Sequence, residues 1–540
     1  MTSNQASEKL NLTTKFAFGA GDIGPAFTAN ILIFFLMPFF TNVAGINPAI
    51  AGSILFVGKI ADAINDPIIG VFSDRTQTKW GRRIPWMIFA AIPFGFTFFL
   101  QWIVPKFSDD IALNNNLLFI YYMMIGIVFN IFYTAVNLPY QALTPELTQD
   151  YNERTNLNSF RFSFSIGASI VSLILAGAIF EVYQGNNQEK YLILGIISTI
   201  FSTLPLFWCP LIIKERGYEP LLNKNQRKIT AYIFISISSI AIIYSIFNFI
   251  NSTSGEDVFN AIIALLIALF IGIMAWSLII AKTEPHLFEA PLGNTEENTE
   301  HNLTYIQQLK IVFTNRPFLY VVGIYLCSWL AVQLTASILI YFVVNWMGLP
   351  EAAFPRVAIA VQGTALVMLF IWQKISNKLD KKIVYFLGSA IWIIAQIGLF
   401  LVQPGQTFLL YALAMLAGCG VSVAYLIPWS MIPDVIDLDE LNTGERREGI
   451  FYGFMVLLQK FGLAFGLFLV GIALEASGFI KPIEGQPIPV QPENALWAIR
   501  LVVAPLPAVV LLAGIVLCYF YPITREYHSQ IRLQLHEKNN

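Results

Sequence analysis

Charged residues are scarce in this chain. Only 12% of its 540 residues are Asp, Glu, Lys or Arg, whereas 56% are hydrophobic. Soluble domains average about 25% charged residues, so this composition excludes a soluble globular protein and indicates a polytopic membrane protein. The formal net charge of −2 gives no reason to expect a nucleic-acid partner.

Cysteine and histidine are rare as well, with four of each. The cysteines lie in apolar runs, where single buried thiols are common, so we expect neither disulfides nor a zinc site. The histidines lie in polar segments, without the spacing of metal ligands. Because the chain also shows no nucleophile paired with a base, we expect no transition-metal site, no cofactor and no enzymatic activity.

What the chain does contain is a series of apolar runs of about 20 residues, the length that a helix needs to cross a bilayer. Six lie in the first part of the chain and six in the last: 16–42, 48–72, 85–104, 116–140, 159–183, 190–213, 317–346, 355–373, 383–404, 407–432, 449–475 and 495–521. Two more runs, 229–250 and 258–280, contain no charged residue. We therefore predict an all-α polytopic membrane protein, with 14 spans if this inserted pair crosses the membrane and 12 if it does not.

The spans divide the chain into two six-helix halves. The predicted parts are an N-terminal half over 1–214, a linker over 215–316 with the hydrophobic hairpin 229–280, a C-terminal half over 317–524 and a tail over 525–540. Lys and Arg collect in alternate connections, so the positive-inside rule predicts that both termini are cytoplasmic. Loop 374–383 takes the place in the second half that loop 73–84 has in the first, which indicates a parallel repeat.

The most informative charges are two aspartates inside the second apolar run. A carboxylate at the bilayer centre costs roughly 2.5–3.5 kcal/mol. Asp62 and Asp66 are one helical turn apart, so they share a helix face, and Asn65 points nearly the same way. Their oxygens repel one another unless a cation or a proton sits among them, which predicts a cation-coupled carrier. Alternatively, the aspartates form ion pairs with Lys59 and Lys460 that serve only to stabilise the fold.

Three separated runs carry a family resemblance: ADAINDPIIGVFSDRTQTKWGRRIPW at 61–86, NLPYQALTPELTQDYNERTNLNSFR at 137–161 and PDVIDLDELNTGERREGIFYG at 433–453. Together they resemble the glycoside-pentoside-hexuronide:cation symporters of the major facilitator superfamily, which include the melibiose and glucuronide carriers. The resemblance extends over nearly the whole chain apart from 215–300. It implies the major facilitator fold and symport of a sugar-type solute with sodium or protons by alternating access.

The resemblance also implies a cation site that comprises Asp62, Asn65 and Asp66 together with Thr134. Hard oxygen ligands of this kind suit sodium, and buried carboxylates can instead take up a proton. Lys460 matches a lysine that lies near both cation and sugar in the melibiose carrier. Deep in its span it needs an anionic partner, Asp62 or Asp66, unless its amine reaches the lipid surface instead.

The implied substrate site departs from the family pattern. Arg161 matches a substrate-binding arginine, whose guanidinium suits hydroxyl or carboxylate oxygens; a contact at the membrane edge is the alternative. Two sugar-binding carboxylates and a stacking tryptophan of the melibiose carrier are matched by Ala26, Asn137 and Gln141, so we do not expect galactoside recognition of that kind. Asp22, elsewhere on the first span, resembles the glucuronide branch; helix packing is the alternative.

Loop 73–84 resembles the superfamily signature between the second and third spans. Its charges, with those of two other segments on the same side, could form ion pairs between the halves that close one face, an equilibrium that substrate and ion would bias. Taken singly, such charge runs are typical of solvated surface. The predicted cytoplasmic gate comprises Asp74, Arg75, Arg82, Arg83, Glu146, Arg154, Asp434, Arg446 and Arg447.

The sequence thus predicts a cation-coupled symporter of a glycoside, pentoside or hexuronide. We expect a functional monomer in the cell (inner or plasma) membrane, whose partners are a small-molecule solute and the bilayer. A second interpretation keeps the carrier and changes the cargo, because ILFVGKIADAINDP and WGRRIPW also resemble animal carriers that move lysophospholipids with sodium. A third, a non-transporting sensor, would need an appended soluble domain, for which the tail after Pro522 is short.

Overall fold

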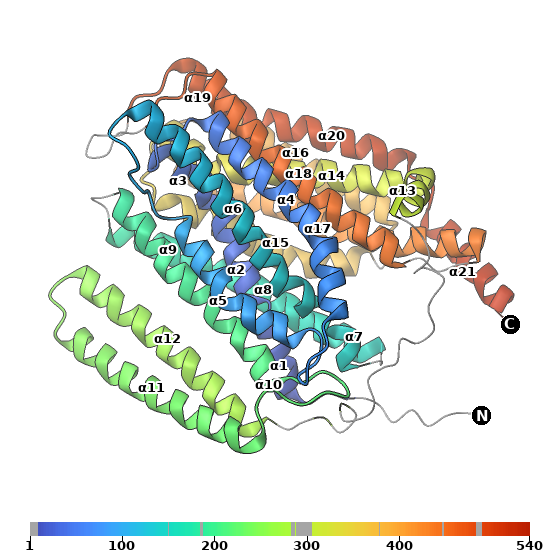
Figure 1. Ribbon diagram of the computed structural model, residues 1–540. Coiled ribbons are helices and arrows are strands. Elements are labelled where there is room, and N and C mark those ends of the chain that lie inside the picture. The colour runs from blue at the N-terminus through green and yellow to red at the C-terminus, as the bar shows by residue number, and fades with distance from the viewer. Residues whose placement is uncertain are drawn as a thin grey trace. The chain divides into compact units, whose positions relative to one another are not determined.

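The computed structural model of the chain is shown in Figure 1. It describes residues 9–148, 151–183, 187–281, 284, 287, 305–376, 378–444, 448–481 and 489–539. Over these residues the regular structure is helical, and one isolated β-bridge joins Thr78 to Gly81. The predicted all-α architecture is therefore confirmed for the part of the chain that the structure describes.

Contacts divide the chain into two compact units, residues 1–32 with 64–294 and residues 33–63 with 295–540. Helix α4 (Pro48–Arg75) contributes to both, since the division falls after Ala63. The first unit otherwise contains α1 (Leu12–Ala20), α2 (Ile23–Ile31), α5 (Ile84–Leu100), α6 (Ile111–Gln141), α7 (Thr144–Leu147), α8 (Tyr151–Val182), α9 (Asn187–Thr203), the 3-10 helix η2 (Leu204–Phe207), α10 (Trp208–Ile212), α11 (Lys224–Ile250) and α12 (Gly255–Ile280).

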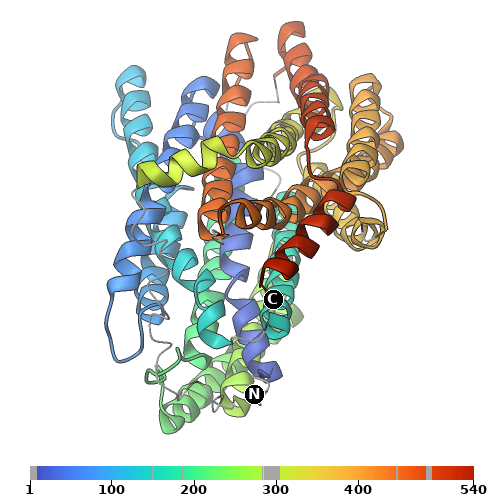
Figure 2. The same cartoon turned by 90° about the vertical axis from the view of Figure 1, so that its right-hand side faces the viewer.

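The second unit contains the C-terminal helices and the end of the first span. Its elements are the π-helix η1 (Leu32–Leu36), α3 (Met37–Asn42), α13 (Tyr305–Thr314), α14 (Arg316–Tyr341), the π-helix η5 (Phe342–Trp346), α15 (Ala353–Ser376), α16 (Lys381–Leu401), α17 (Thr407–Thr443), α18 (Glu448–Ala476), α19 (Glu493–Val503), α20 (Pro505–Phe520) and α21 (Arg525–Asn539). In this unit α21, drawn in dark red, packs against α17 (Figure 2).

This division differs from the predicted halves. Residues 33–63, which the sequence assigns to the N-terminal half, pack within the second unit. The hydroxyls of Thr41 and Tyr341 are 2.6 Å apart, and the rings of Phe35 and Phe354 meet edge to face. The hairpin α11–α12, predicted as part of a linker, belongs to the first unit.

Twelve of the described helices are long and apolar enough to cross a membrane. They include α11 and α12, which is what the 14-span interpretation requires. Among the other predicted spans, α5 is a shorter apolar helix of 17 residues. Helix α4 has 28 residues and carries the two aspartates singled out above.

The first span and the span that opens the second half both contain a π-helix and both end at a glycine cap. The first span closes with the π-helix Leu32–Leu36 and α3, and the span that opens the second half closes with the π-helix Phe342–Trp346. Each is followed by a glycine with φ of +67°, Gly45 and Gly348, a conformation that other residues rarely adopt. In both places the amides beside that glycine bond to carbonyls five and six residues back.

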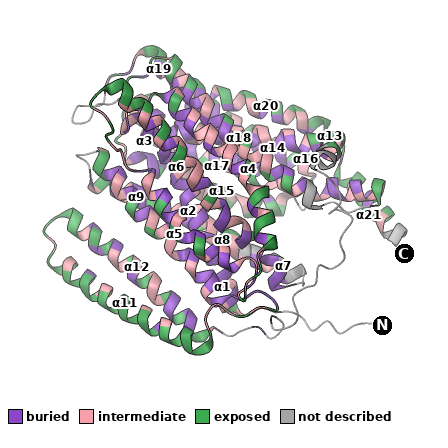
Figure 3. Ribbon diagram, viewed as in Figure 1, coloured by how far each residue is buried: buried purple, intermediate pink, exposed green. Residues whose placement is uncertain are grey.

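Two serine hydroxyls link the packed helices of the hairpin α11–α12. Ser238 of α11 donates to the carbonyl oxygen of Ala268 over 2.7 Å, and Ser245 donates to the carbonyl oxygen of Ala261. The rest of α11 is largely exposed (Figure 3), which suits a helix that faces hydrocarbon. The hairpin therefore attaches to the first unit mainly through α12.

Candidate functional site

Asp62 of α4 is a buried carboxylate with two ammonium partners in the second unit. It is 1% exposed. Its Oδ2 atom lies 3.1 Å from Nζ of Lys460 on α18 and 3.6 Å from Nζ of Lys59, one turn back on α4. The structure thus gives Lys460 the anionic partner that the sequence predicts. Because a buried charge is stable only when it is paired, each of these groups constrains the other.

Two glycines allow α4 and α18 to approach closely. A Cβ atom on Gly471 of α18 would lie 2.4 Å from the carbonyl oxygen of Pro48, and one on Gly52 of α4 would lie 3.2 Å from the carbonyl oxygen of Leu467. Small residues at helix contacts are the usual means of close packing between membrane helices. This contact aligns the helix that carries Asp62 with the helix that carries Lys460.

We expect Gly471→Val to destabilise the protein and to weaken solute uptake. The side chain would force α4 and α18 apart, and overpacking of this kind costs about 1–3 kcal/mol. Gly453→Val is the matched control, because Gly453 lies on the same helix and a Cβ there meets nothing within 4 Å. Thermal unfolding of the two variants in detergent checks the prediction, and equal midpoints would contradict it.

Asp66 and Thr134 come together in the first unit. The Thr134 hydroxyl, on α6, donates to Oδ1 of Asp66 over 3.0 Å. Nδ2 of Asn65 is buried and makes no hydrogen bond within the described residues. Pro67, directly after Asp66, has no amide hydrogen for the carbonyl of Ala63, one turn back in α4. The Asp66 carboxylate and the Ala63 carbonyl of α4 thus lie on one turn, and the Thr134 hydroxyl of α6 contacts the carboxylate.

The predicted substrate residues Asp22 and Arg161 form an ion pair in the first unit. Asp22 lies at the break between α1 and α2 and is 6% exposed. Its Oδ2 atom is 3.5 Å from Nε of Arg161 on α8. The Arg161 guanidinium also lies 5.8 Å from the ring centre of Tyr140, whose hydroxyl donates to the carbonyl of Phe18. This charged cluster interrupts the apolar interior of the unit.

The other predicted substrate residues lie near this cluster in sequence but differ in exposure. Ala26 is partly buried on α2, and Gln141 is exposed at the end of α6. Oδ1 of Asn137 is buried and makes no hydrogen bond within the described residues. Asn137 is thus a polar group with an unused acceptor, whereas neither Ala26 nor Gln141 adds a buried polar group.

The gate residues of loop 73–84 pair within the first unit. Arg82 forms an ion pair with Glu146 and Arg83 with Asp74, while Arg75 is exposed at the end of α4. The expectation of ion pairs between the halves therefore stays a prediction. Arg446 and Arg447 lie outside the described residues, as does the side chain of Arg154, which belongs to α8.

Glu215 organises this loop, a role that the sequence analysis missed. Its carboxylate is fully buried and accepts hydrogen bonds from three successive backbone amides, those of Arg82, Arg83 and Ile84. Burial raises the pKa of Glu215, although these three amides oppose the shift. The sequence offers little indication of this role, because Glu215 lies in a short charged run after the sixth span, where charged residues are common.

We expect Glu215→Gln to lower stability by about 1–3 kcal/mol, the typical cost of leaving a buried donor unpaired. The glutamine side chain keeps one acceptor oxygen, but its other group is an NH2 donor. This donor would face the three backbone amides of the loop, which are donors too. Glu219→Gln is the control, since Glu219 is exposed in the same connection. Thermal unfolding measures the difference. An unchanged midpoint for Glu215→Gln would show that the loop does not depend on this carboxylate.

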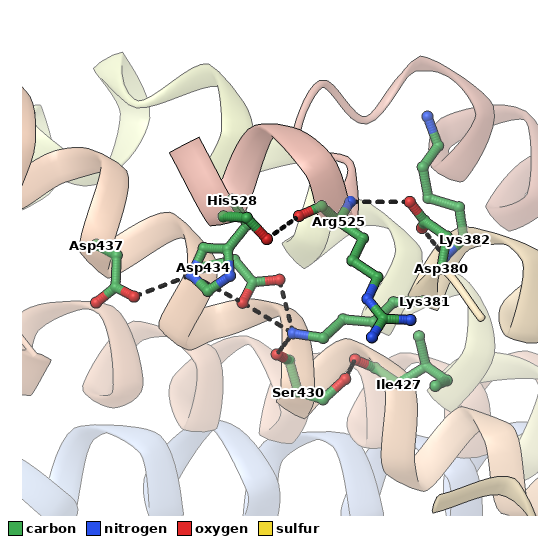
Figure 4. Close-up of polar contacts among 10 residues, drawn as sticks. Asp380, Lys381, Lys382, Ile427, Ser430, Asp434, Asp437, Arg525 and His528 are labelled. Carbon is green, nitrogen blue, oxygen red and sulfur yellow. Dashed lines mark hydrogen bonds and ion pairs between the residues drawn. The ribbon is translucent and has the colours of Figure 1, made fainter. Parts of the chain in front are cut away.

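Asp434 belongs to a separate ionic cluster in the second unit (Figure 4). Nζ of Lys381 on α16 lies 2.6 Å from its Oδ2 atom, and Nε2 of His528 on α21 lies 3.5 Å from its Oδ1 atom. His528 also contacts Asp437 at 2.9 Å. Asp434 was among the predicted gate residues, whereas its partners Lys381 and His528 were not, because they come from distant segments.

The sequence family described as MFS/sugar transport protein matches residues 17–233 and 225–525. An uncharacterized symporter of Synechocystis is 56% identical over 543 residues, which cover all of both chains. The sodium-dependent lysophosphatidylcholine symporter 1-A of Danio rerio is 25% identical over 536 residues, which cover 98% of this chain and 90% of the relative. These findings support the predicted superfamily but not the glycoside-pentoside-hexuronide branch.

Among solved structures, the inward-open xylose transporter XylE from E. coli is similar, with a TM-score of 0.53 and 12% identity over 95% of each chain. At this identity the likeness shows the fold alone. It confirms the predicted major facilitator fold.

Proposed function

Because the chain belongs to the MFS/sugar transport protein family, we propose that it is a symporter that couples a cation to the transport of a small organic solute. The proposal depends chiefly on one observation, the burial of Asp62 at 1% exposure with Lys460 as its partner. A buried acid and amine in membrane-spanning helices are costly and are typical of ion pathways. Alternating access of the two halves would carry ion and solute across.

The proposed cation site comprises Asp62, Asn65, Asp66 and Thr134. The hydrogen bond between Thr134 and Asp66 supports it, because it aims a hydroxyl oxygen at a carboxylate. Oxygen ligands of this kind suit sodium, and the carboxylates could instead take up a proton. The relatives that are named sodium-dependent favour sodium. In the absence of the ion, the Lys460 ammonium would neutralise Asp62.

For the solute we propose a glycoside, pentoside or hexuronide. Arg161 and Asp22 supply donors and acceptors in the interior of the first unit, and Oδ1 of Asn137 is an acceptor that has no hydrogen bond within the described residues. A polyhydroxylated solute needs both kinds of group. The gate residues Asp74, Arg82, Arg83, Glu146 and Asp434 would close the cytoplasmic side, and both termini would lie in the cytoplasm of a cell-membrane monomer.

A second candidate is a lysophospholipid or another amphiphile. It is favoured by the similarity to lysophosphatidylcholine symporters over nearly the whole chain. Ala26 and Asn137 also lack the carboxylates that the melibiose carrier uses on sugar. In this case Arg161 would bind the headgroup phosphate.

Uptake into proteoliposomes tests both candidates. Radiolabelled sugars, uronides and lysophosphatidylcholine would be compared with and without an inward sodium or proton gradient. We expect one class to accumulate against its gradient only when an ion gradient is present. Equal uptake in protein-free liposomes, or uptake that ignores both ion gradients, would overturn the proposed symport.

A further inference from the structure

An apolar recess lies where the inserted hairpin packs against the other helices of the first unit. Its volume is about 370 Å³, and it is lined by residues of α2, α8, α9, η2 and α12. Among the lining side chains Ser163 is the only polar one. A cavity of about 150 Å³ with aliphatic and aromatic walls stays dry and accepts a benzene-sized molecule. This recess has more than twice that volume, so we expect it to be neither filled with water nor left empty.

Two contacts fasten α12 to neighbouring parts of the first unit. Early in α12, the side chain of Asn260 accepts from the Tyr183 hydroxyl over 3.2 Å. Further along, Phe270 packs edge to face on Trp208. Ile267, which lies between Asn260 and Phe270 in the sequence, and Phe27 of α2 both line the recess.

The recess is accessible from the outside along α8. Ser163, Gly167 and Val171 line it at intervals of four residues, and all three are exposed. A side chain at Gly167 would meet nothing within 4 Å. Since α8, α9 and α12 are candidate membrane spans, the medium that reaches this opening is hydrocarbon.

We propose that this recess is a binding site for one acyl chain of a membrane phospholipid, held between α12 and the helices α2, α8 and α9. The bound lipid would fill the space between the hairpin and the other helices of the first unit and so link the two. It is not the cargo, so the site is independent of the proposed symport. Its apolar walls favour hydrocarbon, and the single hydroxyl of Ser163 provides no binding site for a headgroup inside.

Photolabelling tests the proposal. The full chain would be reconstituted with phosphatidylglycerol that carries a diazirine on one acyl chain, irradiated and mapped by peptide mass spectrometry. We expect labelling of the α12 peptide that contains Ile267 and Phe270. Gly167→Leu should reduce this labelling about tenfold, which corresponds to roughly two buried methylene groups. Gly126→Leu is the matched control, because Gly126 on α6 also has open space around its Cβ.

Three results would overturn the proposal. The first is labelling spread evenly over exposed helices such as α11. The second is labelling of α12 that Gly167→Leu leaves unchanged. The third is loss of labelling on addition of lysophosphatidylcholine but not of unlabelled phosphatidylglycerol, which would identify the occupant as a single-chain amphiphile. Failure of the uptake assays would leave the labelling pattern as expected, so the two proposals fail separately.

Discussion

Asp62→Asn is expected to reduce ion-driven accumulation of the solute strongly in protein that still folds. Asparagine keeps the shape of the side chain but removes the charge that would hold a cation and balance Lys460. Coupling between two binding sites amounts to about 1–3 kcal/mol, or roughly 5–150-fold in affinity. Uptake in proteoliposomes under a sodium or proton gradient should therefore fall by about this factor.

Asp109→Asn is the control for this variant. Asp109 is an exposed carboxylate paired with Lys106 in a connecting loop, so the same chemical change there should leave uptake intact. Thermal unfolding in detergent reports whether Asp62→Asn still folds. If the folded variant accumulates solute as the parent does, and the ion gradient still drives it, Asp62 is not part of the ion site.

The pair of Asp22 and Arg161 should show a different pattern. Either Asp22→Asn or Arg161→Gln leaves one charge without its partner, and breaking a buried pair costs about 3–5 kcal/mol. Both single variants should therefore unfold at lower temperature. The double variant removes both charges and should regain most of the lost stability. The double variant should nevertheless fail to take up solute, because the proposed binding of the solute needs the donors of Arg161.

Thermal unfolding and uptake of the four proteins in this cycle separate the two roles. Recovery of uptake in the double variant would show that the pair serves only to hold α2 and α8 together. The pair of Lys15 and Glu153 provides the comparison. It lies in the same unit at 2.9 Å with similar side-chain exposure, and its double neutralisation should leave solute specificity unchanged.

Residues with a large transfer cost were predictable from sequence. Asp62, Asp66 and Lys460 each interrupt an apolar run, and such an interruption is informative because the bilayer penalises it wherever the helix lies. The partners of these residues were less predictable. Two acids, Asp62 and Asp66, were candidate partners of Lys460, and in the structure Lys460 forms its ion pair with Asp62. Glu215 and His528 lie in polar segments, where a charge has no cost and hence carries no signal.

The sequence alone determined the membrane character and the apolar spans, because each follows from the local cost of placing a side chain in hydrocarbon. The tertiary structure decided which groups meet. In the structure, residues 33–63 pack with the C-terminal helices. The Glu215 carboxylate accepts hydrogen bonds from the end of loop 73–84, and a recess lies beside the hairpin. These contacts join segments far apart in the chain, and their energies depend on helix approach distances that hydropathy does not encode.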